Sequence, residues 1–307
     1  MARGVAFFSV DLDTVDTGIR GDPASPEASE LRRRCYAAAM PRLLGLLDEL
    51  GIKATLFAVA RDALRPGPAD LLRDAAGCGH EIASHSLSHD RALPWKGVED
   101  IRRDVSLSKR ILSDAVGAAV AGFRSPGATV SRELLTALRE EGYLYDSSLN
   151  PSLVYNIAKF AYARLRGARL PAQFEPFAPR RPYLPSRANI ARRAEGDGMD
   201  ILEIPLTSVP LLPIPFMNYF LMKLGAAAAA PIALAAASRD FISYVLHDHE
   251  LLQRSDLGGL QAAEGMASAY LDSDLPSRLN FIQYTVRRLL RTHDFVTLGE
   301  HARRNIS

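Results

Sequence analysis

Short apolar runs alternate with longer segments of helical periodicity along most of this 307-residue chain. The first apolar run, 5–10, precedes a helical pattern at 27–50 that ends at Gly51, a residue type favoured just after the last turn of a helix. The alternation predicts further strands at 54–60, 80–84, 120–123, 144–145, 201–206, 241–246 and 295–298, and further helices at 70–76, 98–116, 132–141 and 277–291. Repeated strand and helix pairs favour a parallel sheet covered by helices, so we expect an α/β fold.

Polar side chains follow directly on most of the predicted strands. The carboxyl ends of parallel strands share one face of a barrel, and enzymes with this architecture build their sites there. We therefore expect the side chains that follow the strands to lie close together. They are Asp11, Asp13, His85, His89, Arg124, Asp146 and His247.

Two of these groups have the spacing of a metal site. The histidines stand four residues apart in His85-Ser-Leu-Ser-His89, and the carboxylates stand two apart in Asp11-Leu-Asp13. Two neutral imidazoles and a carboxylate can hold a divalent metal with positions left open for water and substrate, and a second carboxylate can take the proton of that water. Each motif alone also fits a purely structural role, as capping histidines or as an Asx turn.

Three further motifs follow in order: Gly-Phe-Arg-Ser-Pro-Gly at 122–127, Tyr-Asp-Ser-Ser at 145–148 and Tyr-Val-Leu-His-Asp at 244–248. With the aspartate and histidine motifs, they make the chain resemble the polysaccharide deacetylase family, also known as the NodB homology or carbohydrate esterase 4 group. The resemblance covers about 5–145 and resumes at 201–247. It implies a distorted (β/α)7 barrel of the NodB type and a metal-dependent hydrolase of carbon–nitrogen bonds.

The resemblance also implies a role for each matched residue. Asp11 becomes the catalytic base, and Arg124 orients it. His247 becomes the acid that protonates the leaving amine, and Asp146 tunes it. The implied metal ligands are Asp13, His85 and His89. Zinc suits these ligands, but iron, cobalt, nickel or manganese would suit them too, so the identity of the metal stays open.

The chain departs from the family pattern in three places. Leu12 separates two aspartates that are usually adjacent, so the division of Asp11 and Asp13 into base and ligand stays open. Gly127 stands where an aromatic residue is usual, although its backbone N–H could still serve an oxyanion. A tryptophan is absent after the fourth motif, so we expect a different substrate floor.

The composition fits a single domain that spans residues 1–307. Of these residues, 48% are hydrophobic, enough to bury a substantial core without disulfides, and the two cysteines, Cys35 and Cys78, do not form a disulfide framework. The formal net charge is only +2, which gives no sign of nucleic-acid binding. Cleavage of an N-terminal secretory signal would remove Asp11 from the protein. We therefore expect a cytoplasmic location, with the inner face of the membrane as the alternative.

The segment from about 151 to 240 is predicted to be an insertion, basic at first and then apolar. The basic part contains Arg164, Arg166, Arg169, Arg180, Arg181, Arg187 and Arg192, with Glu175 as the single acid between 159 and 193. The apolar part, 209–237, carries one charge, Lys223. One transmembrane crossing would place His247 on the opposite side from His85, so three interpretations remain: a solvated basic face, covering helices, or a flap over the site that touches lipid.

These observations predict removal of an acetyl or formyl group from the nitrogen of an amino sugar. Arginines for a phosphate and an apolar flap for a tail make a lipid-linked amino sugar the sharper hypothesis. The enzymatic alternative is hydrolysis of a cyclic imide or ureide. The non-enzymatic alternative is a carbohydrate-binding module that has lost catalysis.

Overall fold

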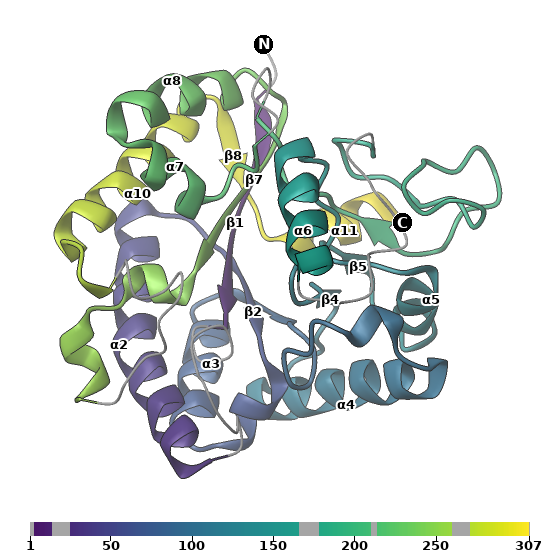
Figure 1. Ribbon diagram of the computed structural model, residues 1–307, viewed down its shortest axis with the longest axis horizontal. Coiled ribbons are helices and arrows are strands. Elements are labelled where there is room, and N and C mark those ends of the chain that lie inside the picture. Colours follow the sequence, from purple (N-terminus) through teal and green to yellow (C-terminus); the bar gives the residue numbers. More distant parts are fainter. Residues whose placement is uncertain (1–2, 14–24, 166–177, 210–213, 260–270, 307) are drawn as a thin grey trace.

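The fold is built on a curled sheet of parallel strands (Figure 1). The computed structural model describes residues 3–13, 25–165, 178–209, 214–259 and 271–306. The strand order is β6-β5-β4-β3-β2-β1-β7, and β8 pairs with the start of β1. The strands are β1 (Gly4–Leu12), β2 (Thr55–Ala58), β3 (Glu81–Ser84), β4 (Gly122–Phe123), β5 (Tyr145–Asp146), β6 (Leu202–Glu203), β7 (Phe241–His247) and β8 (His293–Phe295).

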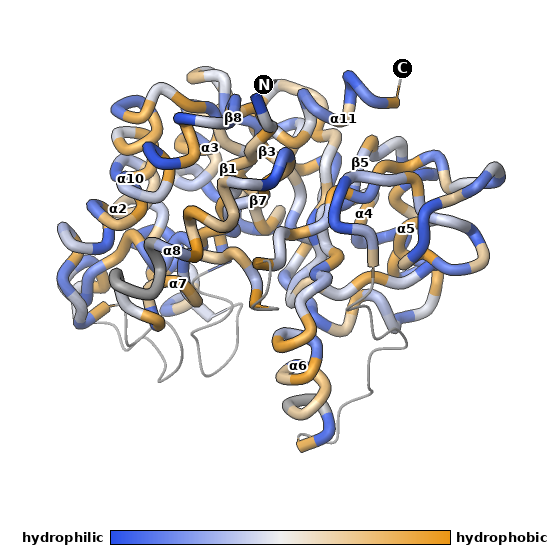
Figure 2. Tube along the Cα trace, turned by 90° about the horizontal axis from the view of Figure 1, so that it is seen from above, coloured by the Kyte–Doolittle hydropathy of each residue, from blue (hydrophilic) through white to orange (hydrophobic). Residues whose placement is uncertain are grey.

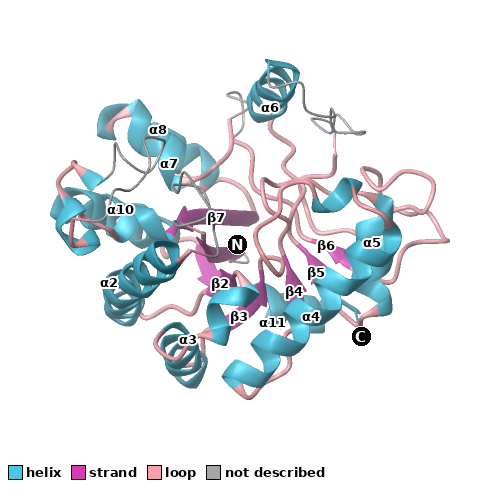
Figure 3. Ribbon diagram, turned by 60° about the horizontal axis from the view of Figure 1, so that its bottom comes forward, coloured by secondary structure: helices cyan, strands magenta, loops and turns pink. Residues whose placement is uncertain are grey.

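The sheet curls into a half-barrel with helices on its outside, which confirms the predicted fold class (Figure 3). β1 lies at its centre and is buried from Ala6 onwards. Outer helices cover the sheet with their apolar faces, as the βα pattern requires. They are α2 (Pro26–Leu50), α3 (Pro68–Gly77), α4 (Val98–Val116), α5 (Arg132–Glu140) and α10 (Leu275–Leu289).

Local chemistry sets the ends of the longest outer helices. The Ser25 side chain accepts a hydrogen bond from the Ala28 N–H at 3.1 Å and so caps the start of α2. Gly51 ends the same helix in the left-handed conformation, with φ 65°. Gly117 ends α4 in the same way, with φ 70°. The helices predicted at 27–50 and 98–116 are therefore confirmed to within a residue.

The last predicted strand is displaced in the structure. We expected it at 295–298, whereas β8 ends at Phe295 and α11 (Leu298–Ile306) begins directly afterwards. The reason is the Thr297 hydroxyl, which accepts a hydrogen bond from the Glu300 N–H at 3.1 Å and caps the new helix. A β-branched residue with high strand propensity here acts as a helix cap.

The insertion supplies three helices that the sequence did not locate: α6 (Leu153–Leu165), α7 (Asn218–Leu224) and α8 (Ala226–Ala236). α7 packs on β7, and α8 packs on α7 and α10. The structure describes α7 and α8 as covering helices, with Tyr219, Leu221 and Ile232 buried. Arg166, Arg169, Glu175 and residues 210–213 lie outside the described residues. Within the described parts of the chain, no helix is both long and apolar enough to cross a membrane.

The close contact between β4 and β5 gives a test of the fold. A Cβ on Gly122 would lie 2.0 Å from Cζ of Tyr145, a buried ring whose hydroxyl donates to Glu81 Oε1 at 3.0 Å. We expect Gly122→Ala to lower the free energy of unfolding by about 1–3 kcal/mol through overpacking. Gly45→Ala is the matched control, because nothing lies within 4 Å of its Cβ position inside α2.

The control should raise the free energy of unfolding by up to about 1 kcal/mol, since alanine is the better helix former. Chemical denaturation measures both effects. Equal midpoints for the wild type and Gly122→Ala would contradict the β4 to β5 packing.

Candidate metal centre and active site

The carboxyl ends of β1, β2 and β7 bring the first site residues together. Asp11 is in register with Phe57 of β2 on one side and with His247 of β7 on the other. Residues in register on neighbouring parallel strands point to the same face of a sheet, and Asp13 follows two residues later on that face. Asp11 and Asp13 are almost fully buried, with 6% and 4% of their surface exposed.

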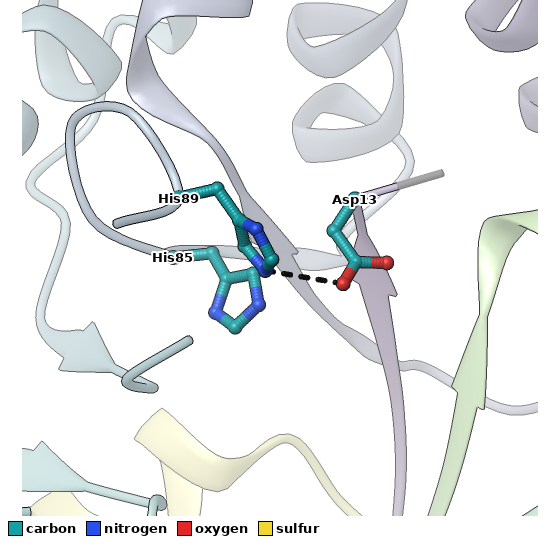
Figure 4. A group of neighbouring side chains, drawn as sticks. All are labelled: Asp13, His85 and His89. Carbon is teal, nitrogen blue, oxygen red and sulfur yellow. Dashed lines mark ion pairs between the residues drawn. The ribbon is translucent and has the colours of Figure 1, made fainter. Parts of the chain in front are cut away.

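Asp13, His85 and His89 form a compact set of metal-type ligands (Figure 4). One ligand atom from each lies within 4.8 Å of the others. The Oδ2 atom of Asp13 is 3.2 Å from Nε2 of His89, and the two imidazole centroids are 5.0 Å apart. Two nitrogens and one carboxylate oxygen fit a divalent cation such as zinc, so the predicted donor set fits the geometry.

A backbone contact fixes the orientation of His85. Its Nδ1 lies 2.8 Å from the carbonyl oxygen of Arg124. A carbonyl oxygen can only accept, so Nδ1 carries the hydrogen and Nε2 keeps its lone pair. Burial lowers the pKa of His85 to about 4, which keeps the imidazole neutral at physiological pH. A neutral imidazole with a free Nε2 is the form that binds a metal.

The loop that carries the histidines is tightly wound. Ser86 and His89 both have positive φ angles, 69° and 57°, which are uncommon for residues other than glycine. The Ser86 hydroxyl accepts from the His89 N–H at 2.9 Å, and Asp104 Oδ1 accepts from the Leu87 N–H at 2.9 Å. These bonds hold the strained turn that brings His89 opposite Asp13.

Arg124 binds Asp11, as the resemblance implied. Its Nη1 donates to Asp11 Oδ1 at 2.7 Å and to Ser9 Oγ at 3.1 Å. Its Nε and Nη2 donate to the carbonyl and hydroxyl oxygens of Ser147 at 3.0 and 3.1 Å. The guanidinium carbon also lies 4.0 Å from the ring centroid of Phe57. Asp11 is thus held by a buried cation, and Asp13 rather than Asp11 joins the histidines.

His247 faces the second oxygen of Asp11. Its Nε2 is 3.9 Å from Asp11 Oδ2, while its Nδ1 is 3.7 Å from Glu250 Oε1. Burial acts to lower the pKa of His247, but the surrounding carboxylates of Asp13, Glu250 and Asp11 outweigh it and raise the pKa to about 9. The raised pKa favours the protonated imidazole, the state required of a proton donor.

The structure does not place Asp146 beside His247. Asp146 Oδ1 and Oδ2 accept from the Ser148 hydroxyl at 2.6 Å and from the Ser148 N–H at 3.2 Å. Its carboxyl group also hydrogen bonds to Glu203, and burial raises its pKa, so the two acids share a proton. Among the described residues, the carboxylates paired with the His247 ring are those of Asp11 and Glu250, so the tuning of His247 by Asp146 stays a prediction.

The motifs leave the role of Gly127 untested and do not include Glu250. Gly127 adopts φ 70° in the turn after Arg124, and the oxyanion role of its N–H stays a prediction. Glu250, which none of the motifs includes, has the spacing of a capping box from His247. That spacing is the one sequence pattern that could have marked it.

Two other groups of potential metal ligands lie nearby: His247, His249 and Glu250, and a set of Asp13, Asp248 and His249. In the first group, both carboxylate oxygens of Glu250 already accept hydrogen bonds, from the His247 N–H and from Asn218 Nδ2. The second group would compete with His85 and His89 for Asp13. In the set of Asp13, His85 and His89, by contrast, a backbone contact orients His85 with its Nε2 lone pair available to a metal.

Comparison with known proteins agrees with this architecture. The profile of the polysaccharide deacetylase family matches residues 34–145, the part of the chain that carries the histidine motif and Arg124, and so agrees with the predicted resemblance there. A Mycobacterium smegmatis protein named as a polysaccharide deacetylase superposes with a TM-score of 0.60 at 18% identity, covering 99% of this chain and 91% of that one. An allantoinase superposes at 0.58 and 19% identity, covering 98% and 90%.

The same fold also carries other chemistry. A 4-alpha-glucanotransferase from Thermococcus litoralis superposes with a TM-score of 0.58 at 13% identity, covering 98% of this chain and 40% of that one. At these identities the likeness shows the fold alone. The geometry of the side chains must therefore decide the chemistry.

Removing a ligand should weaken metal binding. We expect His85→Ala and His89→Ala to bind at least about tenfold less zinc at equilibrium, because each takes away one of three protein ligands. Asp11→Asn should keep the metal, since Asp11 is bound to Arg124 and not to the histidines. Elemental analysis after dialysis against zinc measures the content.

Cys78→Ser serves as the control, because this exposed thiol precedes His85 by seven residues in the sequence without joining the ligand set. If Asp11→Asn lost the metal while Asp13→Asn kept it, the two aspartates would have the opposite roles.

Proposed function

We propose that this chain, which matches the polysaccharide deacetylase family over residues 34–145, is a metal-dependent hydrolase that removes an N-acyl group from an amino sugar. One observation carries the proposal. The Asp11 carboxylate, held by a buried arginine, and the imidazole of His247 face each other across 3.9 Å, beside a set of three metal-type ligands. These side chains would serve as a base, an acid and the ligands of a Lewis acid around one point, which is what amide hydrolysis requires.

Each residue has a defined task in the proposed reaction. Asp13, His85 and His89 would hold the divalent ion, which when bound polarises the acyl carbonyl and lowers the pKa of water. Asp11 takes the proton of the attacking water through Oδ2, while Arg124 holds Oδ1 in place. His247 donates its proton to the departing nitrogen as the carbon–nitrogen bond breaks. The products are a free amine and a carboxylate, acetate or formate.

Asp11→Asn tests this assignment. An amide cannot take the proton of water, so kcat should fall by about 10²–10⁴-fold while the metal stays bound. Release of acetate or formate from a panel of N-acetyl and N-formyl amino sugars, followed by mass spectrometry, measures turnover. Asp70→Asn, on the surface of α3, is the control and should match the wild type.

A cyclic ureide in the same panel separates the enzymatic alternative. If only the ureide is hydrolysed, the substrate is a cyclic ureide and not an amino sugar. Sugar binding without any released acid, with metal bound, would favour a binding module.

We further propose that the amino sugar is carried by a lipid at the cytoplasmic face of a membrane. The support comes from α6, which projects from the body of the fold (Figure 2). Val154, Ile157 and Leu165 recur at helical spacing on it and are 42%, 54% and 87% exposed. The segment Leu153–Leu165 carries Lys159 and Arg164 but no acid. Apolar side chains with cations and without acids suit an anionic bilayer surface.

α6 is also joined to the site. The Tyr155 hydroxyl donates to the carbonyl oxygen of Gly127 at 3.1 Å, and Lys159 Nζ donates to that of Ala128 at 2.8 Å. Both carbonyls belong to the turn that follows Arg124. The lipid contact that we expected from 209–237 is thus assigned to α6, because the described helices of that segment pack mainly on β7 and α10.

Two charges on α6 test the lipid proposal. We expect Ile157→Asp with Leu165→Asp to weaken binding to vesicles of anionic phospholipid by at least about tenfold, since two exposed aliphatic side chains are lost to the bilayer. Turnover of a water-soluble N-acyl sugar should not change. Tyr284→Asp is the matched control, because this ring is 52% exposed on α10, away from α6.

Vesicle sedimentation and parallel assays on lipid-linked and soluble substrates give the result. Unchanged vesicle binding in the double variant would refute the lipid contact. A change in oligomeric state instead would show that the face of α6 binds a second copy of the chain.

A further inference from the structure

We infer that Glu250 is the residue that positions His247, and that Asn218 of the insertion holds Glu250 for this task. The inference rests on the proposed function for the role of His247 as proton donor. The inference gives Asn218, which lies in the insertion and in none of the sequence motifs, a supporting role in catalysis. Glu250 lies in the short helix η3 (Asp248–Leu251), directly after β7.

The Glu250 carboxylate is completely buried and faces His247. Its Oε1 accepts from the His247 N–H at 2.9 Å and lies 3.7 Å from Nδ1 of the same residue. This arrangement leaves Nε2 directed at Asp11. A carboxylate behind one imidazole nitrogen, with the reacting proton on the other, is the arrangement that orients a histidine in acid–base catalysis.

Asn218 fixes the second oxygen of this carboxylate. Its Nδ2 donates to Glu250 Oε2, and its Oδ1 accepts from the Tyr244 hydroxyl at 2.6 Å. The reverse amide orientation would set Oδ1 against a carboxylate oxygen, so the two contacts together determine the rotamer. Asn218 is fully buried at the first position of α7. Through this side chain the insertion contacts Glu250, the carboxylate next to His247.

The backbone around Glu250 is held from the opposite side. Arg278 of α10 donates from Nη1 to the carbonyl oxygen of Glu250 and from Nη2 to that of Leu252, both at 2.7 Å. A buried arginine thus fixes the main chain while Asn218 fixes the side chain. The carboxylate has little freedom to turn away from His247, and Asp146 is engaged with Glu203 instead.

The chain offers a variant pair that separates catalytic support from simple tethering. Glu250→Gln removes the carboxylate from His247. The double variant, Glu250→Gln with Asn218→Asp, restores an amide-to-carboxylate hydrogen bond between the same two positions, with donor and acceptor exchanged. If the pair only ties α7 to η3, the exchange restores activity; if His247 needs a carboxylate behind Nδ1, it does not.

Two substrates report on proton donation. An N-acyl amino sugar has a poor leaving group that must be protonated, whereas p-nitrophenyl acetate releases a stable phenolate without help. We expect both variants to lower kcat on the amide by about 10–100-fold, with KM and zinc content near wild type. The loss on the ester should be less than about threefold. Glu49→Gln, an exposed partner of Arg287, is the control and should change neither activity.

Recovery of amide turnover in the double variant, or equal losses on amide and ester, would overturn the inference. If the wild type hydrolyses none of the amino sugars, that result refutes only the proposed function. Nitrogen-15 spectra of the histidine rings then still test the role of Glu250. His247 should show a protonated Nδ1 in the wild type and a changed Nδ1 shift in Glu250→Gln. An unchanged ring spectrum would refute the role of Glu250.

Discussion

The buried pair of Arg124 and Asp11 connects most of the site to the sheet. The guanidinium of Arg124, a residue with 1% of its surface exposed, reaches Ser9 and Asp11 of β1, Phe57 of β2 and Ser147 after β5. Its backbone carbonyl meanwhile orients His85. Removing one partner of such a pair leaves an uncompensated buried charge, which costs about 3–5 kcal/mol. The base and one metal ligand therefore take their positions from the same residue.

This dependence explains why some of the site could be predicted from the sequence. Side chains that directly follow a strand inherit their position from the sheet, so the order of Asp11, His85, Arg124 and His247 along the chain was enough to bring them together. The helix at 98–116 was equally accessible, because Gly117 ends an amphipathic pattern in the left-handed conformation. Both rest on information contained within a few neighbouring residues.

The parts that could not be predicted depend on partners far away in the chain. Glu250 is held by Asn218, 32 residues earlier, and Asp146 is hydrogen bonded to Glu203, 57 residues later. Nothing in the sequence next to Glu250 or Asp146 shows which distant residue each of these acids will contact. α6 escaped prediction for the opposite reason: its apolar stripe faces outward, so the spacing that usually indicates a buried face lies on an exposed one.

The sheet order ends at β6 on one side and β7 on the other, which leaves a seam in the half-barrel. The long connection between these two strands contains α7 and α8, so it joins the two free edges of the sheet. Segments placed at such a seam can be lengthened, shortened or exchanged without breaking a strand pair. The rest of this connection can thus diverge in length and sequence while the hydrogen-bond ladder under the metal ligands stays intact, and Asn218 is the point at which it stays tied to the site.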